Sequence, residues 1–294
     1  MWEQRSFQGD HHGKGTLYLV PTPIGNLDDI TFRALDVLKH TDILAAEDTR
    51  HTMKLCTHFS IHVPMYSYHE HNKKTSGKKL IAELESGKNV ALVTDAGTPG
   101  ISDPGADLAA ACAARQIPVV PLPGANAALT SLIASGLPTD HFLFYGFLPR
   151  TNKERSRALK ELSTLTCTLI FYESPYRVEG TLKDLKAAFG NRRVSVSREL
   201  TKQFETFVRG TMDELIAAMG GPQKGEFCLI VDGAPEGSAA QADLWWLALD
   251  IPAHVAYYMA NQGMSVKEAI KQTAEDRRLP KRDVYRAYHH LEKP

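Results

Sequence analysis

Residues 89–105 read NVALVTDAGTPGISDPG, and this stretch decides the fold. An apolar, β-branched run ends abruptly at Asp95, glycines and prolines fill the loop up to Gly105, and an alanine-rich helical pattern begins after Asp103. The stretch therefore predicts a strand, a glycine-rich loop and a helix. Glycine permits positive φ and close backbone approach to a ligand. The loop matches neither G-x-G-x-x-G nor a P-loop, so it is either a nucleotide-type ligand loop or a structural turn.

The same order of strand, loop and helix recurs through the first half of the chain. Apolar runs predict strands at residues 16–20, 42–46, 117–122 and 142–148. The first run breaks into PTPIGN, the second into EDTRH and the third into PGAN. Because ligands bind at strand ends in an open α/β sheet, these loops are candidate sites. For residues 47–51 the alternative is a helix N-cap with flanking charge.

A second α/β unit follows. Predicted strands at residues 168–172, 193–197, 204–208 and 226–231 alternate with helices and indicate a mixed sheet. We predict a disordered tail (1–14), an N-terminal α/β domain (15–149), a C-terminal α/β domain (150–232), a small-residue linker (233–242) and a helical module (243–294).

The C-terminal module carries no strand signal. Its last two helices flank a short break at Leu279-Pro280, which is typical of a helix-turn-helix-like module. Basic residues outnumber acidic ones from Arg277 to Lys293, so the last helix could face phosphates. The alternative is a solvated face of a small helical bundle.

Composition excludes several classes of protein. Lys+Arg and Asp+Glu are 34 each among 294 residues, so any polyanion must meet a local basic patch. The four cysteines form no C-x-x-C pair, and His69-Glu70-His71 does not match H-E-x-x-H, so we expect no metal site. We see no membrane-length apolar run and no signal peptide core, and we expect a cytoplasmic protein.

Eight motifs in order resemble the ribosomal RNA small subunit methyltransferase I family, a branch of the tetrapyrrole methylase superfamily. They are VPTPIGNLDDIT, AAEDTRHT, TDAGTPGISDPG, PLPG, GFLP, FYESPYR, RELTK and KGEFCLIVDG. The resemblance covers residues 16–232 closely, and the helical tail also fits.

The resemblance implies a two-domain α/β enzyme, usually a homodimer, with S-adenosylmethionine in the cleft between the domains. It implies 2′-O-methylation of a cytidine ribose in the decoding region of 16S rRNA. Because a cytidine buried in folded RNA must be splayed out to reach a cleft, we expect the small ribosomal subunit as the substrate. Matching positions assign cofactor binding to Asp95, Ala96, Gly97, Thr98, Pro99, Asp103, Pro104, Gly105, Pro123, Gly124, Ala125, Tyr172 and Glu173.

Proton handling and substrate orientation are assigned to Glu47, Asp48, Arg50 and His51, with Asp48 as the hypothetical base and His51 as its rival. Charge and loop position assign substrate contacts to Pro23, Gly25, Asn26, Arg198, Lys202, Arg282 and Arg286.

Two other classes compete with the RNA enzyme. A tetrapyrrole C-methyltransferase would share the fold, but its first loop usually reads G-x-G-P-G-D, whereas residues 21–26 here read PTPIGN. A nucleic-acid-binding regulator would use the C-terminal helices, but it needs no two-domain cleft.

Overall fold

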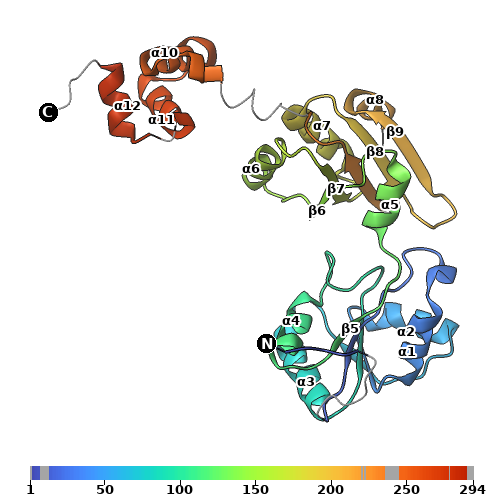
Figure 1. Cartoon of the computed structure of the whole chain (residues 1–294). Coiled ribbons are helices and arrows are strands. Elements are labelled where there is room, and N and C mark those ends of the chain that lie inside the picture. Colours follow the sequence, from blue (N-terminus) through green and yellow to red (C-terminus); the bar gives the residue numbers. More distant parts are fainter. Residues whose placement is uncertain are drawn as a thin grey trace. The chain divides into compact units, whose positions relative to one another are not determined.

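The computed structural model describes residues 2–6, 13–219, 221, 223–235, 245–277 and 279–289 (Figure 1). Most of the predicted linker lies outside these residues, as do residues 7–12 of the predicted tail. The chain divides into two compact units, Met1–Lys160 with Cys167–Asp232, and Glu161–Thr166 with Gly233–Pro294. The predicted domain limits stay predictions.

The first sheet of the larger unit is parallel throughout. Its strands are β1 (Leu17–Leu19), β2 (Ile43–Ala46), β3 (Met65–Ser67), β4 (Val90–Val93) and β5 (Val119–Pro121), in the order β3-β2-β4-β1-β5. All four residues of β4 are buried, because helices cover both faces of the sheet.

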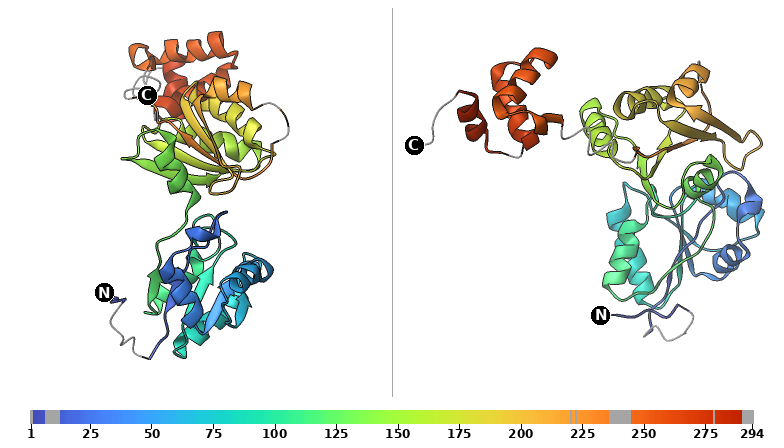
Figure 2. Two further views of the ribbon diagram at one scale, coloured as in Figure 1. Left: turned by 90° about the vertical axis from the view of Figure 1, so that its right-hand side faces the viewer. Right: turned by 45° about the horizontal axis from the view of Figure 1, so that its top comes forward.

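The side chains of β4 alternate between the two helical layers. Val90 and Leu92 pack with α3 (Lys73–Glu85) and α4 (Ala106–Ala114), whereas Ala91 and Val93 pack with α1 (Phe32–His40) and α2 (Thr49–His58). Figure 1 shows these two helical layers, and Figure 2 gives two further views of them. Since the chain leaves β1 and β2 toward one layer and β4 toward the other, the carboxyl end of β4 is a topological switch point.

The second sheet is mixed. It comprises β6 (Phe142–Phe147), β7 (Thr168–Glu173), β8 (Arg193–Arg198), β9 (Thr206–Thr211) and β10 (Phe227–Val231), in the order β6-β7-β10-β8-β9. Only the β6–β7 pair is parallel among the strand pairs of this described sheet. Helix α5 (Ala127–Ser135) packs Ala128 and Leu132 against β7 and β10. The remaining helices of this half are α6 (Asn152–Leu162), α7 (Val178–Phe189) and α8 (Met212–Ala218).

The smaller unit contains η2 (Trp245–Ala248), α10 (Ile251–Gln262), α11 (Val266–Arg277) and α12 (Lys281–Tyr288). Val255, Ile270 and Val284, one from each α-helix, form its core. His254 is fully buried, stacks on Trp246 and accepts a hydrogen bond from Arg277 Nε at 3.1 Å. This polar cluster ties η2 to α10 and α11.

The predicted fold class is confirmed: a parallel sheet, a second sheet and C-terminal helices are all present. Four local features differ from the sequence-based expectation. Strand β3 was not predicted, and the strand expected at 204–208 begins at Thr206. The helix expected to open at Asp28 and Asp29 is divided into η1 (Leu27–Asp29) and α1, because Thr31 caps α1 anew. Residues 245–248 form a 3-10 turn separate from α10, because Asp250 caps that helix anew and Pro252 occupies its first turn.

Candidate functional site

Three loops at the carboxyl edge of the first sheet are joined by hydrogen bonds. Thr22, after β1, and Gly97, after β4, exchange two backbone hydrogen bonds of 2.9 Å. The backbone N–H of Asp48, after β2, donates to the Asp95 carboxylate at 3.1 Å. The structure thus brings the predicted strand-end loops together at the switch point.

Glycine is required at two positions of the loop after β4. Gly97 has φ +88° where its backbone pairs with Thr22. Gly105 has φ +137° at the start of α4, and a Cβ there would lie 2.8 Å from Leu92 Cδ2. At both positions the positive φ strains the backbone of any residue with a side chain, and at Gly105 a Cβ would also clash with Leu92.

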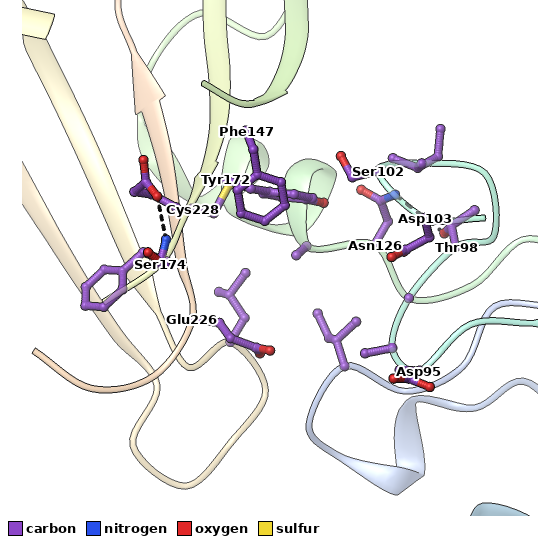
Figure 3. Close-up of a pocket in the computed structure, with 18 of the residues that line it drawn as sticks. Asp95, Thr98, Ser102, Asp103, Asn126, Phe147, Tyr172, Ser174, Glu226 and Cys228 are labelled. Carbon is purple, nitrogen blue, oxygen red and sulfur yellow. Dashed lines mark hydrogen bonds between the residues drawn. The ribbon is translucent and has the colours of Figure 1, made fainter. Parts of the chain in front are cut away.

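A cavity of about 410 Å³ opens beside this loop, between residues of the two sheets (Figure 3). Its size suits a nucleoside-bearing ligand. Figure 3 shows Asp95, Thr98, Ser102, Asp103 and Asn126 facing Phe147, Tyr172, Ser174, Glu226 and Cys228 across it. The lining residues are Ile24, Glu47, 95–98, 101–103, Asn126, Ala127, Phe147, 172–175, Leu200 and 226–228.

On the side of the first sheet, the carboxyl groups of Glu47, Asp95 and Asp103 line this cavity. Burial, reinforced by the Glu47 and Asp95 carboxylates, raises the pKa of Asp103 to about 7. Burial and the neighbouring Asp95 also raise the pKa of Glu47. Because like charges in a partly buried site repel, this cluster favours a cationic ligand or a bound proton.

The wall from the second sheet is aromatic and rigidly held. The rings of Phe147 and Tyr172 meet edge to face with centroids 5.7 Å apart. The Tyr172 hydroxyl accepts a hydrogen bond from the Ala128 backbone N–H at 3.1 Å, in the first turn of α5. Burial raises the pKa of Tyr172, so the phenol stays neutral.

Glu173 is 3% exposed and directs its carboxylate into the protein. One oxygen accepts from the Ser174 N–H at 2.8 Å, the dashed line in Figure 3, and the other accepts from the Thr181 hydroxyl at 2.7 Å. Arg155 in turn donates to that hydroxyl at 2.7 Å. Glu173 therefore fixes the 174–175 wall of the cavity through its neighbours.

The predicted proton-handling residues do not share one environment. Of the four, Glu47 lines the large cavity, whereas His51 lines a second cavity. Asp48 is the N-cap of α2. Arg50 donates two hydrogen bonds to the Asp48 carboxylate, from Nε at 3.1 Å and from a terminal nitrogen at 2.8 Å. The Arg50 guanidinium holds the pKa of Asp48 well below its usual range, which makes that carboxylate a weak base.

The predicted cofactor residues fall into two groups. Those that line the large cavity are Asp95, Ala96, Gly97, Thr98, Asp103, Tyr172 and Glu173. Those that are not among its lining residues are Pro99, Pro104, Gly105, Pro123, Gly124 and Ala125. One residue of the second group, Ala125, supports the loop, because its carbonyl accepts a hydrogen bond from Thr98 Oγ1 at 2.9 Å.

The predicted substrate residues are spread more widely. Gly25 packs against residues 200–202, and Lys202 is paired with Glu199 at 2.9 Å and Glu226 at 3.0 Å. Arg198 has a buried Nε without a hydrogen-bond partner among the described residues. The other predicted positions lie in the second cavity (Pro23), at the N-cap of η1 (Asn26) and on α12 (Arg282, Arg286).

Several lining residues were missed by sequence reasoning. Asn126 could have been found, because an asparagine before an alanine-rich helix is an N-cap signal, and its side chain accepts from Leu129 N–H. The sequence predicts only a strand or a loop at Phe147, Leu200 and residues 226–228. It does not indicate that these residues line the cavity, because this depends on how the two sheets pack.

The described residues contain no group of three or more His, Cys, Asp or Glu side chains arranged to hold a metal ion. His69 and His71 lie with ring centroids 6.0 Å apart. Among the helices that the structure describes, none is long and apolar enough to cross a membrane.

Comparison with known proteins defines the class. The family of Tetrapyrrole (Corrin/Porphyrin) Methylases matches residues 16–216. A solved cobalt precorrin-4 methyltransferase aligns with a TM-score of 0.55 at 18% identity, over 76% of this chain and 98% of its own. A uroporphyrin-III C-methyl transferase from Thermus thermophilus, complexed with S-adenyl homocysteine, aligns with a TM-score of 0.51 at 16% identity, over 78% and 100%. The fold and the site thus define a methylase of this class.

Curated relatives narrow the assignment. The chain is 54% identical to ribosomal RNA small subunit methyltransferase I of Halalkalibacterium halodurans, over 98% of this chain and 99% of the relative. It is 52% identical to the Bacillus subtilis protein of the same name, over 97% and 98%. The chain belongs to the ribosomal RNA small subunit methyltransferase I family.

Proposed function

We propose that this chain transfers a methyl group from S-adenosylmethionine to the ribose 2′-oxygen of a cytidine in the decoding region of 16S rRNA. The single observation that carries the methyl-transfer chemistry is the acid-lined cavity of about 410 Å³ at the switch point. Support for an RNA acceptor comes from the curated relatives, which are named for ribosomal RNA of the small subunit.

The cavity fits the proposed cofactor. S-adenosylmethionine supplies a methyl group on a positively charged sulfur and also carries an ammonium group. The carboxyl groups of Glu47, Asp95 and Asp103 complement that charge, and the volume accommodates a nucleoside. A structural neighbour was solved with S-adenyl homocysteine. Loop residues 95–98, with Asn126 and Ala127, would hold the cofactor against the Tyr172 wall.

The main contribution of the protein is alignment. Fixing two reactants in an in-line arrangement can supply about 7–11 kcal/mol of the barrier. Backbone pairing of Thr22 with Gly97, and the Ala125–Thr98 hydrogen bond, hold the loop still. These bonds would keep the loop in one conformation while the cofactor and the acceptor are aligned.

We assign proton acceptance from the 2′-hydroxyl to Glu47. Its pKa is raised, it lines the cavity and it belongs to the predicted catalytic set, whereas Asp48 is neutralised by Arg50. A base with raised proton affinity contributes typically about 10²- to 10⁴-fold.

An unstacked nucleotide would meet aromatic side chains at the cavity. Phe147 lines it and is 54% exposed, and Tyr176, next to the lining residue Pro175, is 94% exposed. RNA bound in this way is splayed out and stacked on aromatic rings. Arg198 and the basic residues of α12 are proposed to contact RNA phosphates.

We also propose a cytoplasmic homodimer. An apolar face of α5 supports self-association, because Leu129 and Ile133 are 48% and 77% exposed one turn apart.

Comparison of acceptors tests the proposal. Labelled S-adenosylmethionine should transfer its methyl group to small ribosomal subunits that lack the modification, and not to a uroporphyrin-type ring. Label on the ring alone would contradict the proposed RNA acceptor and would indicate a tetrapyrrole methyltransferase.

A further inference from the structure

A second cavity of about 240 Å³ lies between η1 and α2, next to the strand end of β4. Residues of α2 that line it include His51, Lys54 and His58. Because positions i, i+3 and i+7 of a helix share one face, these three side chains form a basic row along the cavity. We call this space the α2 cavity.

Lys54 has no ion pair within 4 Å among the residues that the structure describes. Two lysines of the same unit are neutralised, Lys73 by Glu70 and Asp107, and Lys202 by Glu199 and Glu226. Exposed lysines such as Lys78 also have no ion pair among the described residues, and Lys54 differs from Lys78 in that it lines a cavity. An unpaired ammonium beside a cavity is available to an anion, and Lys is a common phosphate ligand.

A buried hydroxyl accompanies the basic row. Thr94 lines the α2 cavity and is 2% exposed, and its Oγ1 has no hydrogen-bond partner among the described residues. Buried hydroxyls are normally satisfied, so an unpartnered one at a cavity marks a place for an additional polar group.

Asp95 connects the α2 cavity to the large one, because it lines both. It is the acidic member of the α2 cavity lining, and the Asp48 N–H bonds its carboxylate at 3.1 Å. A ligand in the α2 cavity therefore lies beside the wall where the proposed transfer takes place. In RNA, the phosphodiester is the anionic group that neighbours a ribose 2′-oxygen.

We propose that the α2 cavity is a subsite for a phosphodiester of the acceptor RNA, held by Lys54 with His51 and His58. The inference rests on the proposed function and adds to it a phosphate-recognition site next to the acceptor ribose. The subsite fixes the ribose by its backbone, independently of the base.

The test compares two charge reversals in the full-length protein. Lys54→Glu changes the cavity, and Lys78→Glu changes an exposed lysine of α3, which covers the opposite face of the sheet (Figure 1). Binding of small ribosomal subunits lacking the methyl mark is measured by filter retention over a salt series, without S-adenosylmethionine. Cofactor affinity and thermal unfolding are measured in parallel.

Lys54→Glu should weaken subunit binding by about 10-fold or more, since it removes a charged hydrogen bond and adds repulsion. It should also reduce the slope of log affinity against log salt by about 0.7–0.9. Lys54→Arg should keep most of the affinity, and cofactor affinity should be unchanged in every variant.

Equal subunit affinity and salt slope for Lys54→Glu and Lys78→Glu would overturn the subsite. Methylation by the wild type is scored separately. A wild type that binds subunits without methylating them would refute the proposed function, while the binding comparison would still decide the subsite.

Discussion

The backbone N–H of Asp48 donates a hydrogen bond to the Asp95 carboxylate at 3.1 Å, and this bond joins the loop after β2 to the loop after β4. It places Glu47 on the wall of the large cavity while the Asp48 side chain turns to Arg50. The pKa values of these two adjacent carboxyl groups are therefore shifted in opposite directions: that of Glu47 is raised and that of Asp48 is lowered.

Replacing Glu47 by Gln should lower kcat by about 10²-fold or more, because it removes the proposed proton acceptor. The rate is compared at saturating S-adenosylmethionine, because the same substitution removes part of the charge that complements the cofactor. Asp48→Asn, the matched substitution on the neighbouring residue, should retain a much larger share of the rate. Single-turnover methyl transfer separates the two variants, and a faster Glu47→Gln than Asp48→Asn enzyme would refute the assignment.

Asp103 should make stability depend on pH. Its pKa in the folded protein is about 7 against an ordinary value of 3.8, so between these values the folded chain keeps a proton that the unfolded chain has lost. Stability without cofactor should therefore fall as the pH rises from 3.8 to about 7.

Asp103→Asn removes this effect. Allowing for solvent screening of a half-buried group, the free energy of unfolding of the variant should exceed that of the wild type by about 1–2 kcal/mol at pH 8. Near pH 4 the two free energies should be equal. Urea unfolding at the two pH values measures the difference. Equal free energies of unfolding for the wild type and Asp103→Asn at pH 8 would contradict the claim that the folded protein disfavours the charged Asp103 carboxylate.

Glu173→Ala should destabilise the protein by about 3–5 kcal/mol, because it leaves the buried Thr181 hydroxyl without its acceptor and Arg177 without its carboxylate partner. Cofactor affinity should fall as the 174–175 wall loosens. Glu179→Ala, in the first turn of α7 with an exposed Lys183 partner, should cost under about 1 kcal/mol. Similar losses in chemical denaturation for both variants would contradict the role of Glu173.

Charge reversal on α12 tests whether the smaller unit contacts RNA. Arg282→Glu with Arg286→Glu should weaken subunit binding and reduce the salt slope by about 1.4–1.8, because two phosphate contacts are lost. Lys267→Glu with Lys271→Glu on α11 serves as the control. If both pairs give the same affinity and slope, the helical unit has a structural role.

Much of the fold could be predicted because its signals are local. Residues 90–93 are a buried strand between two helical layers, so they form a continuous apolar run, and the following glycines mark the switch-point loop. Strand β3 escaped prediction because it has three residues of mixed burial at the sheet edge. Such a strand is defined by its pairing with β2 and not by its own pattern.

The site could be predicted only in part, for a related reason. The 95–98 loop and Tyr172 lie at strand ends, which sequence periodicity locates. Phe147 and Glu226 reach the same cavity through the packing of the second sheet, which leaves no local signature. The pKa of Asp103 likewise depends on burial and on two carboxylates from distant loops. From the sequence alone, Lys54 and His58 are typical of an exposed helix face, and only the structure shows that they line the α2 cavity.

The most direct test of the account locates the methyl group. Small ribosomal subunits lacking the modification are incubated with the full-length protein and labelled S-adenosylmethionine, and the 16S rRNA is then digested and mapped. The account predicts label at a single site, on the ribose 2′-oxygen of one cytidine in the decoding region. Label on a base or at another nucleotide, or bound cofactor with unlabelled RNA, would contradict it.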